Sequence, residues 1–153
     1  MKPITGSIAI LMVSLFSCKP YGNSENSRLM QQAQLLIEQK LDSALVLLDA
    51  VNVARFSDAE RAEYTLMRIQ AKDKAGLDIS ADTAIFKVSD DYVAGSDVEK
   101  AALACFYAGR VWQEQGNASA AMQAYLDAER MANSLKNQER LKGLIVFFIG
   151  NLY

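Results

Sequence analysis

The stretch from Tyr21 to Tyr153 contains no proline, and this constrains the fold more than any other feature of the sequence. Proline breaks helices, and the few glycines lie mostly at the ends of apolar segments, so the background favours helix. Apolar residues recur every three or four positions, as one face of a helix requires, and no segment alternates with the period of two typical of strands. The stripes are Ala81, Ile85, Val88 and Tyr92; Val98, Ala101, Cys105, Ala108 and Trp112; Ala121, Tyr125 and Ala128; and Leu141, Ile145, Phe148 and Leu152. The sequence therefore predicts an all-α chain.

Start and stop signals divide this stretch into seven expected helices. The segments 57–60 and 96–99 both read Ser-Asp-Ala/Val-Glu, the form of a capping box in which serine and glutamate side chains bond each other's backbone N–H. Gly76, Gly95 and Gly116 are expected to end helices, because glycine tolerates the left-handed conformation of a C-terminal cap. The expected helices are 27–39, 41–54, 58–75, 81–94, 97–115, 118–134 and 138–153.

The first residues, MKPITGSIAILMVSLFSC, have the layout of a secretory signal peptide. A single cation, Lys2, precedes an uncharged apolar run that ends before Cys18. The run is shorter than the ~20 residues that a helix needs to span a bilayer, so a permanent transmembrane anchor is not expected. Residues 15–18, Leu-Phe-Ser-Cys, resemble the lipobox of bacterial lipoproteins, which implies a diacylglyceryl group on Cys18 and cleavage before it. The alternatives are an ordinary secretory signal followed by an unrelated cysteine, and an uncleaved cytosolic helix.

These features predict three segments. Residues 1–17 form the lipoprotein signal peptide, residues 18–26 are the lipidated cysteine with a polar tether, and residues 27–153 form the helical domain. Lipid chains on Cys18 would hold the protein at a bilayer, since each buried methylene contributes ~0.8 kcal/mol. Cleavage leaves Cys105 as the one unmodified thiol, so no intrachain disulfide is expected.

The start and stop signals also repeat at intervals of about 40 residues. The segment 57–62 recurs as 96–101, Gly76 recurs as Gly116, and 106–112 recurs as 147–153. A unit of this length made of two antiparallel helices is the signature of an α-solenoid. The sequence therefore predicts antiparallel helix pairs stacked as an α-solenoid.

The unit from Ala102 to Asn133 resembles the tetratricopeptide repeat (TPR), in which small residues let two helices approach closely and aromatic residues fill the gaps. The matching positions are the small residues Gly109, Gly116, Ala121 and Ala128 and the aromatic residues Trp112 and Tyr125. Cys105 and Asn133 depart from the tryptophan and proline often found in the family. The helices are also longer than usual, as in its long-helix variants. Together with the lipobox, the chain resembles the exported TPR lipoproteins frequent in Bacteroidetes-type bacteria.

The expected last helix, 138–153, is apolar on more than one face. Gly150 takes the place that Gly109 has in the preceding unit, and Tyr153 takes that of Trp112. One preceding helix cannot cover this surface, and the terminal repeats of solenoids usually carry a polar outer face. We therefore expect either that the chain is truncated at its C-terminus or that a partner covers this face.

No group of residues has the composition of a catalytic or metal site. The chain lacks histidine, the commonest general base and zinc ligand. Cys105 lies on an apolar stripe and is expected in the core, while Asp78 and Asp82 lack the further ligands and the glycine of a calcium loop. Asn117 heads a tripeptide of the N-glycosylation form but is better explained as an N-cap. We expect no enzymatic activity, no cofactor and no metal.

The net charge of −2 argues against a nucleic-acid binder, because no excess of Lys and Arg exists to displace counterions. The TPR resemblance implies a membrane-tethered protein–protein interaction module. In it, a concave groove holds a protein or peptide partner and the lipid on Cys18 binds a bilayer. Such a module can be the N-terminal sensing part of a longer regulatory protein.

The implied location is the bacterial cell envelope, periplasmic or surface-exposed, on the outer membrane rather than the inner one. One alternative function is an envelope-assembly scaffold that handles outer-membrane precursors in the same groove. The other is a carbohydrate-binding uptake lipoprotein with Trp112 as the sugar platform.

Overall fold

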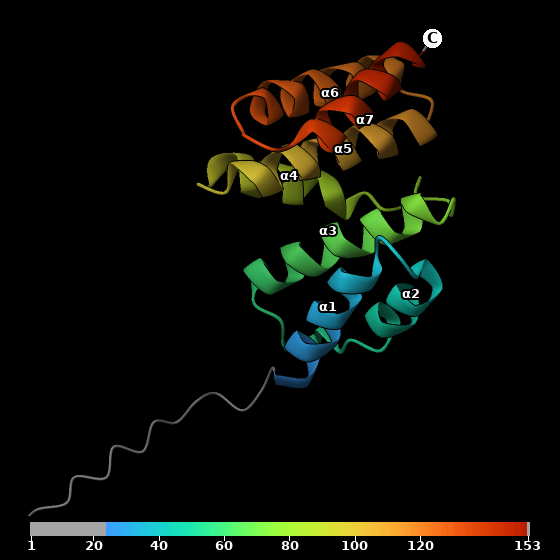
Figure 1. The fold of residues 1–153 in the computed structure, drawn as a ribbon, viewed down its shortest axis with the longest axis vertical. Helices are drawn as coiled ribbons and strands as arrows, with labels where there is room; N and C mark the ends of the chain where they lie inside the picture. Colours follow the sequence, from blue (N-terminus) through green and yellow to red (C-terminus); the bar gives the residue numbers. More distant parts are fainter. Residues whose placement is uncertain (1–23, 153) are drawn as a thin grey trace, which may run out of the picture.

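The computed structural model describes residues 24–152, which form seven α-helices and one short 3₁₀ helix with no strand (Figure 1). The helices are α1 (Ser24–Leu36), α2 (Leu41–Asp49), η1 (Val53–Arg55), α3 (Asp58–Lys74), α4 (Ala84–Ala94), α5 (Val98–Glu114), α6 (Ala118–Asn133) and α7 (Glu139–Gly150). The prediction of an all-α chain is confirmed for these residues. None of the helices described here is long and apolar enough to cross a membrane. The signal peptide (residues 1–17) and Cys18 lie outside the described residues.

Several helix ends follow the capping signals in the sequence. The predicted capping box at Ser57 is present: its Oγ accepts from the Glu60 N–H at 3.3 Å, and the Glu60 carboxylate accepts from the Ser57 N–H at 2.8 Å. Asn117 caps α6 by accepting from the Ala120 N–H at 3.1 Å. Gly76 and Gly116 follow α3 and α5 with φ angles of 69° and 76°, the left-handed conformation that glycine tolerates.

Other predicted caps and boundaries differ from the structure in part. The second capping box does not form, because Asp97 rather than Ser96 accepts from the Lys100 N–H and caps α5. Gly95 ends α4 as predicted, but its φ of −89° is not the left-handed conformation expected there. The helix expected over 41–54 stops at Asp49, since the Asn52 side chain instead caps η1.

The expected helix over 81–94 also begins late, at Ala84. Asp82 lies in the turn that precedes it and forms an ion pair with Lys72 of α3. The remaining helix bounds coincide with the expected ones or differ by up to three residues, close to the usual scatter at helix ends.

Each helix packs on the next along the chain, and α3 also contacts α5. In Figure 1 the helices follow one another along the long axis of the molecule, from α1 at one end to α6 and α7 at the other. The side chains form two hydrophobic clusters. One is built on α1 and α2, and the other extends from α3 to α7.

Helix α3 lies between the two hydrophobic clusters and contributes to both. Met67 and Ala71 pack into the cluster with α1 and α2, whereas Ala62, Leu66 and Ile69 pack into the larger cluster. Because these residues lie on two faces of one helix, α3 joins the two halves of the core.

Helices α5 and α6 approach each other closely at Gly109. A methyl group on Gly109 would lie 2.5 Å from Cδ1 and Cε1 of the Tyr125 ring, a separation that carbon atoms do not adopt. Tyr125 is fully buried, as are Ala121 and Ala128 on the same face of α6. The absent side chain at Gly109 therefore sets the spacing of this helix pair.

This contact predicts opposite effects for two glycine-to-alanine variants. Gly109→Ala forces a methyl group into the buried Tyr125 ring and should lower the free energy of unfolding by about 1–3 kcal/mol. Gly143→Ala is the matched control, because nothing lies within 4 Å of that position in α7. Its better helix propensity should raise stability by about 0.5–1 kcal/mol. Urea denaturation measures both values, and equal effects would contradict the assigned contact.

Candidate functional site

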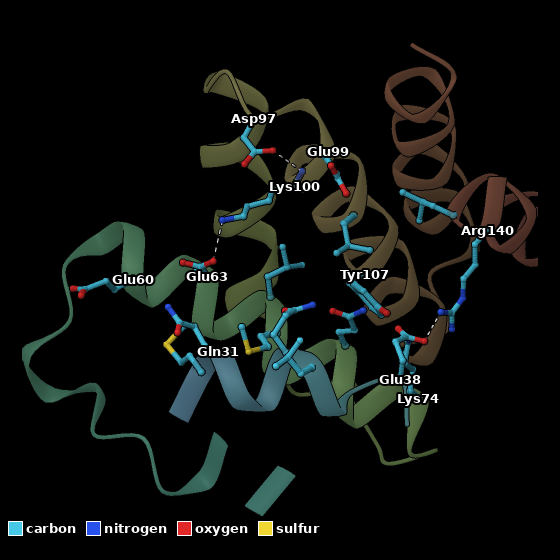
Figure 2. A pocket seen from close by; sticks show the side chains of 18 of the residues that line it. Gln31, Glu38, Glu60, Glu63, Lys74, Asp97, Glu99, Lys100, Tyr107 and Arg140 are labelled. Atoms are coloured by element: carbon cyan, nitrogen blue, oxygen red, sulfur yellow. Dashed lines mark hydrogen bonds and ion pairs between the residues drawn. The ribbon is translucent and has the colours of Figure 1, made fainter. Parts of the chain in front are cut away.

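A groove of about 860 Å³ runs across the molecule, and alternate helices line it (Figure 2). Every lining residue belongs to α1, α3, α5 or α7, or lies within two residues of their ends. Helices α2, α4 and α6 contribute none. On each lining helix the residues recur at spacings of three and four, so one helical face is turned toward the groove.

Apolar residues from all four lining helices form what we call the floor of the groove. The residues that form it are Met30, Leu35, Leu66, Met67, Leu103, Leu141 and Leu144. Leu66, Met67 and Leu141 also belong to the hydrophobic clusters, so the floor is continuous with the core. Leu35 remains 75% exposed. A surface of this kind favours ligands that bring their own apolar side chains.

At one end of the groove, Glu38 joins three helices. Its carboxylate accepts from Lys74 at the end of α3 and from Arg140 at the start of α7 (Figure 2). Partial burial acts to raise the pKa of Glu38, but the hydrogen bonds from Lys74 and Arg140 outweigh this effect and hold the pKa below its ordinary value of 4.5. The ion pairs thus connect α1, the first described helix, with α7, the last.

A second set of polar contacts lies along the N-terminal parts of α3 and α5. Lys100 forms an ion pair with Glu63 at 3.0 Å, which links the two helices. Asp97 caps α5, and Glu99 accepts from the side-chain amide of Gln138 at 2.8 Å. These contacts fix the carboxylates of Asp97 and Glu99 along the groove.

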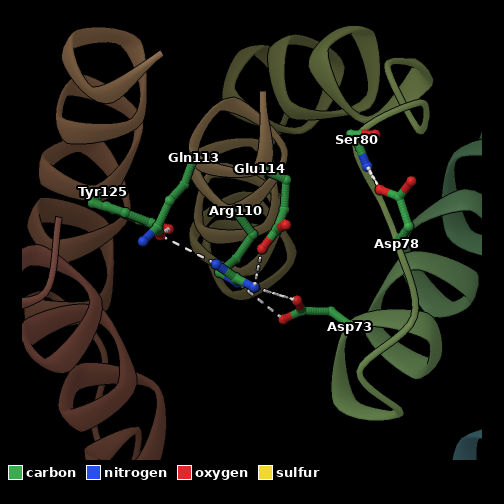
Figure 3. Close-up of polar contacts among 7 residues, drawn as sticks. All are labelled: Asp73, Asp78, Ser80, Arg110, Gln113, Glu114 and Tyr125. Atoms are coloured by element: carbon green, nitrogen blue, oxygen red, sulfur yellow. Dashed lines mark hydrogen bonds and ion pairs between the residues drawn. The ribbon is translucent and has the colours of Figure 1, made fainter. Parts of the chain in front are cut away.

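Behind the groove, Arg110 ties the lining helices together (Figure 3). Its guanidinium donates to Asp73 of α3 at 2.8 and 3.1 Å and to Glu114 at 3.0 Å. The group also lies over the Phe148 ring of α7, 4.3 Å from its centre. The side chains of Arg110 and Asp73 are each only 12% exposed, so solvent screens this pair weakly.

The same cluster reaches α6 through Gln113, whose Oε1 accepts from the Tyr125 hydroxyl at 2.6 Å and from Arg110 at 3.1 Å. Burial acts to lower the pKa of Arg110, but the hydrogen bonds and charge of Asp73 outweigh it and raise that pKa. Burial raises the pKa of Tyr125 to about 12. Both groups therefore keep one protonation state at ordinary pH, as expected of a structural cluster.

The residues singled out from the sequence lie elsewhere. Gly109, Ala121, Tyr125 and Ala128 form the contact between α5 and α6, while Gly116 follows the end of α5. None of these residues lines the groove, nor do Trp112 and Gly150.

Trp112 is half-buried and stacks on Phe86, with ring centres 4.1 Å apart, so Phe86 covers one of its two faces. Gly150 has nothing within 4 Å of its Cβ position, unlike Gly109 in the preceding unit.

The sequence prediction missed the groove residues because the apolar stripes mark the face of each helix that packs in the core, not the face that lines the groove. A second face of the same helices carries polar residues at helical spacing, such as Gln31, Gln34 and Glu38. This pattern was present in the sequence. Alone, however, it cannot be distinguished from a solvated helix face.

The side chains considered for chemistry have structural contacts. Cys105 is buried, as predicted; its Sγ lies 3.2 Å from the Ser89 hydroxyl, and burial raises the pKa of its thiol. Asp78 accepts from the Ser80 N–H in a turn at 2.8 Å (Figure 3). Within residues 24–152, no cluster of three or more Cys, Asp or Glu residues is arranged to hold a metal ion.

Comparison with protein-family models, with curated proteins and with solved structures finds no match to this chain. What the fold defines is therefore a class: an all-helical protein with a groove lined by alternate helices. The function has to be argued from that groove.

The Glu38 contacts predict a specific pH dependence. Because the pKa of Glu38 is lower in the folded chain than in the unfolded one, its contribution is complete above pH ~4.5 and is lost as the pH falls through the folded value. Glu38→Gln should therefore lower stability by about 0.5–1 kcal/mol at pH 7, a modest value because solvent screens the pair.

The difference between Glu38→Gln and the original chain should shrink at pH 3. Denaturation at both pH values measures it. Glu139→Gln is the control, since the Glu139 side chain is 82% exposed and pairs only within α7. A loss of stability that is equal at pH 7 and pH 3 would show that Glu38 acts through packing rather than charge.

Proposed function

We propose that this chain is a membrane-tethered tetratricopeptide-repeat module that holds a segment of a partner protein in the groove between α1, α3, α5 and α7. The observation that supports this proposal is which helices supply the residues that line the groove. Every lining residue comes from alternate helices or their ends. A stack of two-helix repeats produces this surface, because the first helix of each repeat takes the concave side.

The pairing of the helices supports the same arrangement. Helices α1 and α2, α3 and α4, and α5 and α6 pack as consecutive pairs, and α3 also contacts α5. In the third pair, the resemblance to a TPR unit coincides with the close approach of Tyr125 to Gly109. On this proposal α7 is the first helix of a fourth repeat, and the molecule is a segment of an α-solenoid.

The lining favours a protein segment as the ligand. The lining combines apolar residues with charged and amide side chains, and protein interfaces likewise combine apolar with polar groups. The contacts at Glu38 and Arg110 hold the lining helices in place before a ligand arrives, which reduces the entropic cost of binding.

The proposed tether is the lipidated Cys18, which precedes α1 by only a short polar segment. Lipid chains at this position would keep the groove close to a membrane of the cell envelope, with the outer membrane favoured over the inner one. Anchoring would also concentrate the module near partners on the same surface.

The test is site-specific photo-crosslinking of the full chain in a bacterial host that lipidates it. A photoreactive amino acid replaces Leu35, which lines the groove and is 75% exposed. The control position is Val46, which is 69% exposed on α2 and lies outside the groove. We expect discrete protein adducts from position 35 and few from position 46, all in the membrane fraction.

Cys18→Ala is the second arm of the same experiment and should move the chain and its adducts out of the membrane fraction. Equal adducts from positions 35 and 46 would contradict the groove as the binding surface. Membrane retention of Cys18→Ala would contradict the lipid tether and leave the groove assignment intact.

A further inference from the structure

The inference rests on the proposed function and specifies its ligand. We infer that the groove takes an extended, cationic peptide segment. Lysine or arginine side chains of this segment bind near Asp97 and Glu99, and its backbone pairs with the side chains of Gln31, Gln34 and Gln70.

The lining of the groove carries more negative than positive side chains. Five carboxylates and three cations line the groove; they are Glu38, Glu60, Glu63, Asp97 and Glu99, and Lys74, Lys100 and Arg140. Each of the three cations already forms an ion pair within the groove, with Glu38 or with Glu63. The lining is therefore net negative, which attracts cationic ligands and repels anionic ones.

The excess negative charge is concentrated where α5 begins. Asp97 accepts from the backbone N–H of Lys100 at 3.0 Å, and Glu99 accepts from the Gln138 amide at 2.8 Å. Both donors are neutral, so these hydrogen bonds orient the carboxylates without cancelling their charge. Figure 2 shows Asp97 and Glu99 together at the end of the groove away from Glu38. A cationic side chain of the ligand would add the charge-assisted hydrogen bonds that neutral donors do not provide.

Three glutamine side chains in the groove can pair with the backbone of a ligand. Gln31 and Gln34 of α1 and Gln70 of α3 line the groove and form no hydrogen bond with the described part of the chain. Each side-chain amide carries two donors and an acceptor, the same groups that a peptide bond presents. A helical ligand satisfies its own backbone internally, whereas an extended one leaves its N–H and C=O groups to be paired. The three glutamines therefore favour an extended ligand.

The apolar floor can hold apolar side chains of the ligand. Leu66, Leu103 and Leu144 come from three different helices and line the same groove as the glutamines and the two carboxylates. In an extended peptide, alternate side chains point to opposite sides, so every second residue would face this floor. The expected ligand is thus a short segment with alternating apolar residues and one or more cations toward one end.

The test uses a library of random peptides displayed on phage and selected on the full chain. We expect the selected peptides to be enriched in lysine and arginine at one end, with alternating apolar residues. The double variant Asp97→Asn/Glu99→Gln removes both negative charges but keeps the size of each side chain, and asparagine can still cap the helix. A selected synthetic peptide should bind this variant about tenfold or more weakly and should lose affinity as salt rises.

The matched control is Asp42→Asn/Asp90→Asn, which removes the same charge from exposed positions outside the groove. It should bind the peptide with unchanged affinity. N-methylation of central backbone amides of the peptide should weaken binding, because it removes the N–H groups that would donate hydrogen bonds to the side-chain oxygens of the glutamines. Gln70→Ala should weaken the unmethylated peptide as well.

The outcomes separate the inference from the proposed function. Enriched peptides that are neutral or acidic, or that bind equally well when N-methylated, would overturn the inference but keep the groove as a peptide site. Equal losses in the two double variants would show that overall charge, not this site, attracts the ligand, and would also overturn it. A library that yields no binding peptide would overturn the proposed function itself.

Discussion

The ion pair between Asp73 and Arg110 is the contact on which the arrangement of the helices depends. It joins α3 to α5 in a weakly solvated position, and the same guanidinium reaches α7 through Phe148 and α6 through Gln113. A charge held this way is costly to leave unpaired, so the four helices are constrained together rather than pairwise. Three of them, α3, α5 and α7, line the groove.

The groove follows from this constraint and from the position of α3. Because α3 contributes side chains to both hydrophobic clusters, it fixes α1 relative to α5 and α7. Two ion pairs then align neighbouring lining helices: Glu38 with Lys74 for α1 and α3, and Glu63 with Lys100 for α3 and α5. The apolar floor stays open because the even-numbered helices pack behind the odd-numbered ones and not over them.

The sequence was sufficient for most of the helices, because helix formation depends on local signals. The period of the apolar residues, the Ser57 capping box and the glycines after α3 and α5 each act within one or two turns. The N-cap of α5 was wrongly assigned to Ser96 because two good capping residues stand side by side at 96 and 97, and only the packed structure selects between them. The groove could not be predicted in the same way. The Glu38 and Arg140 side chains that meet at one end lie just after the first described helix and in the last one, and no local pattern brings them together.

The groove depends on the side-by-side alignment of α1 with α3 and of α3 with α5, and zero-length carbodiimide cross-linking tests this alignment most directly. This reagent joins a carboxylate to an amine only where the two are in contact. The local pair Lys87–Asp91, at 2.6 Å within α4, reports that the reaction has worked. Peptide mass spectrometry of the cross-linked full chain should identify amide bonds from Glu38 to Lys74 and from Glu63 to Lys100. A chain that forms the Lys87–Asp91 link but neither of the other two would contradict the alignment, and with it the groove.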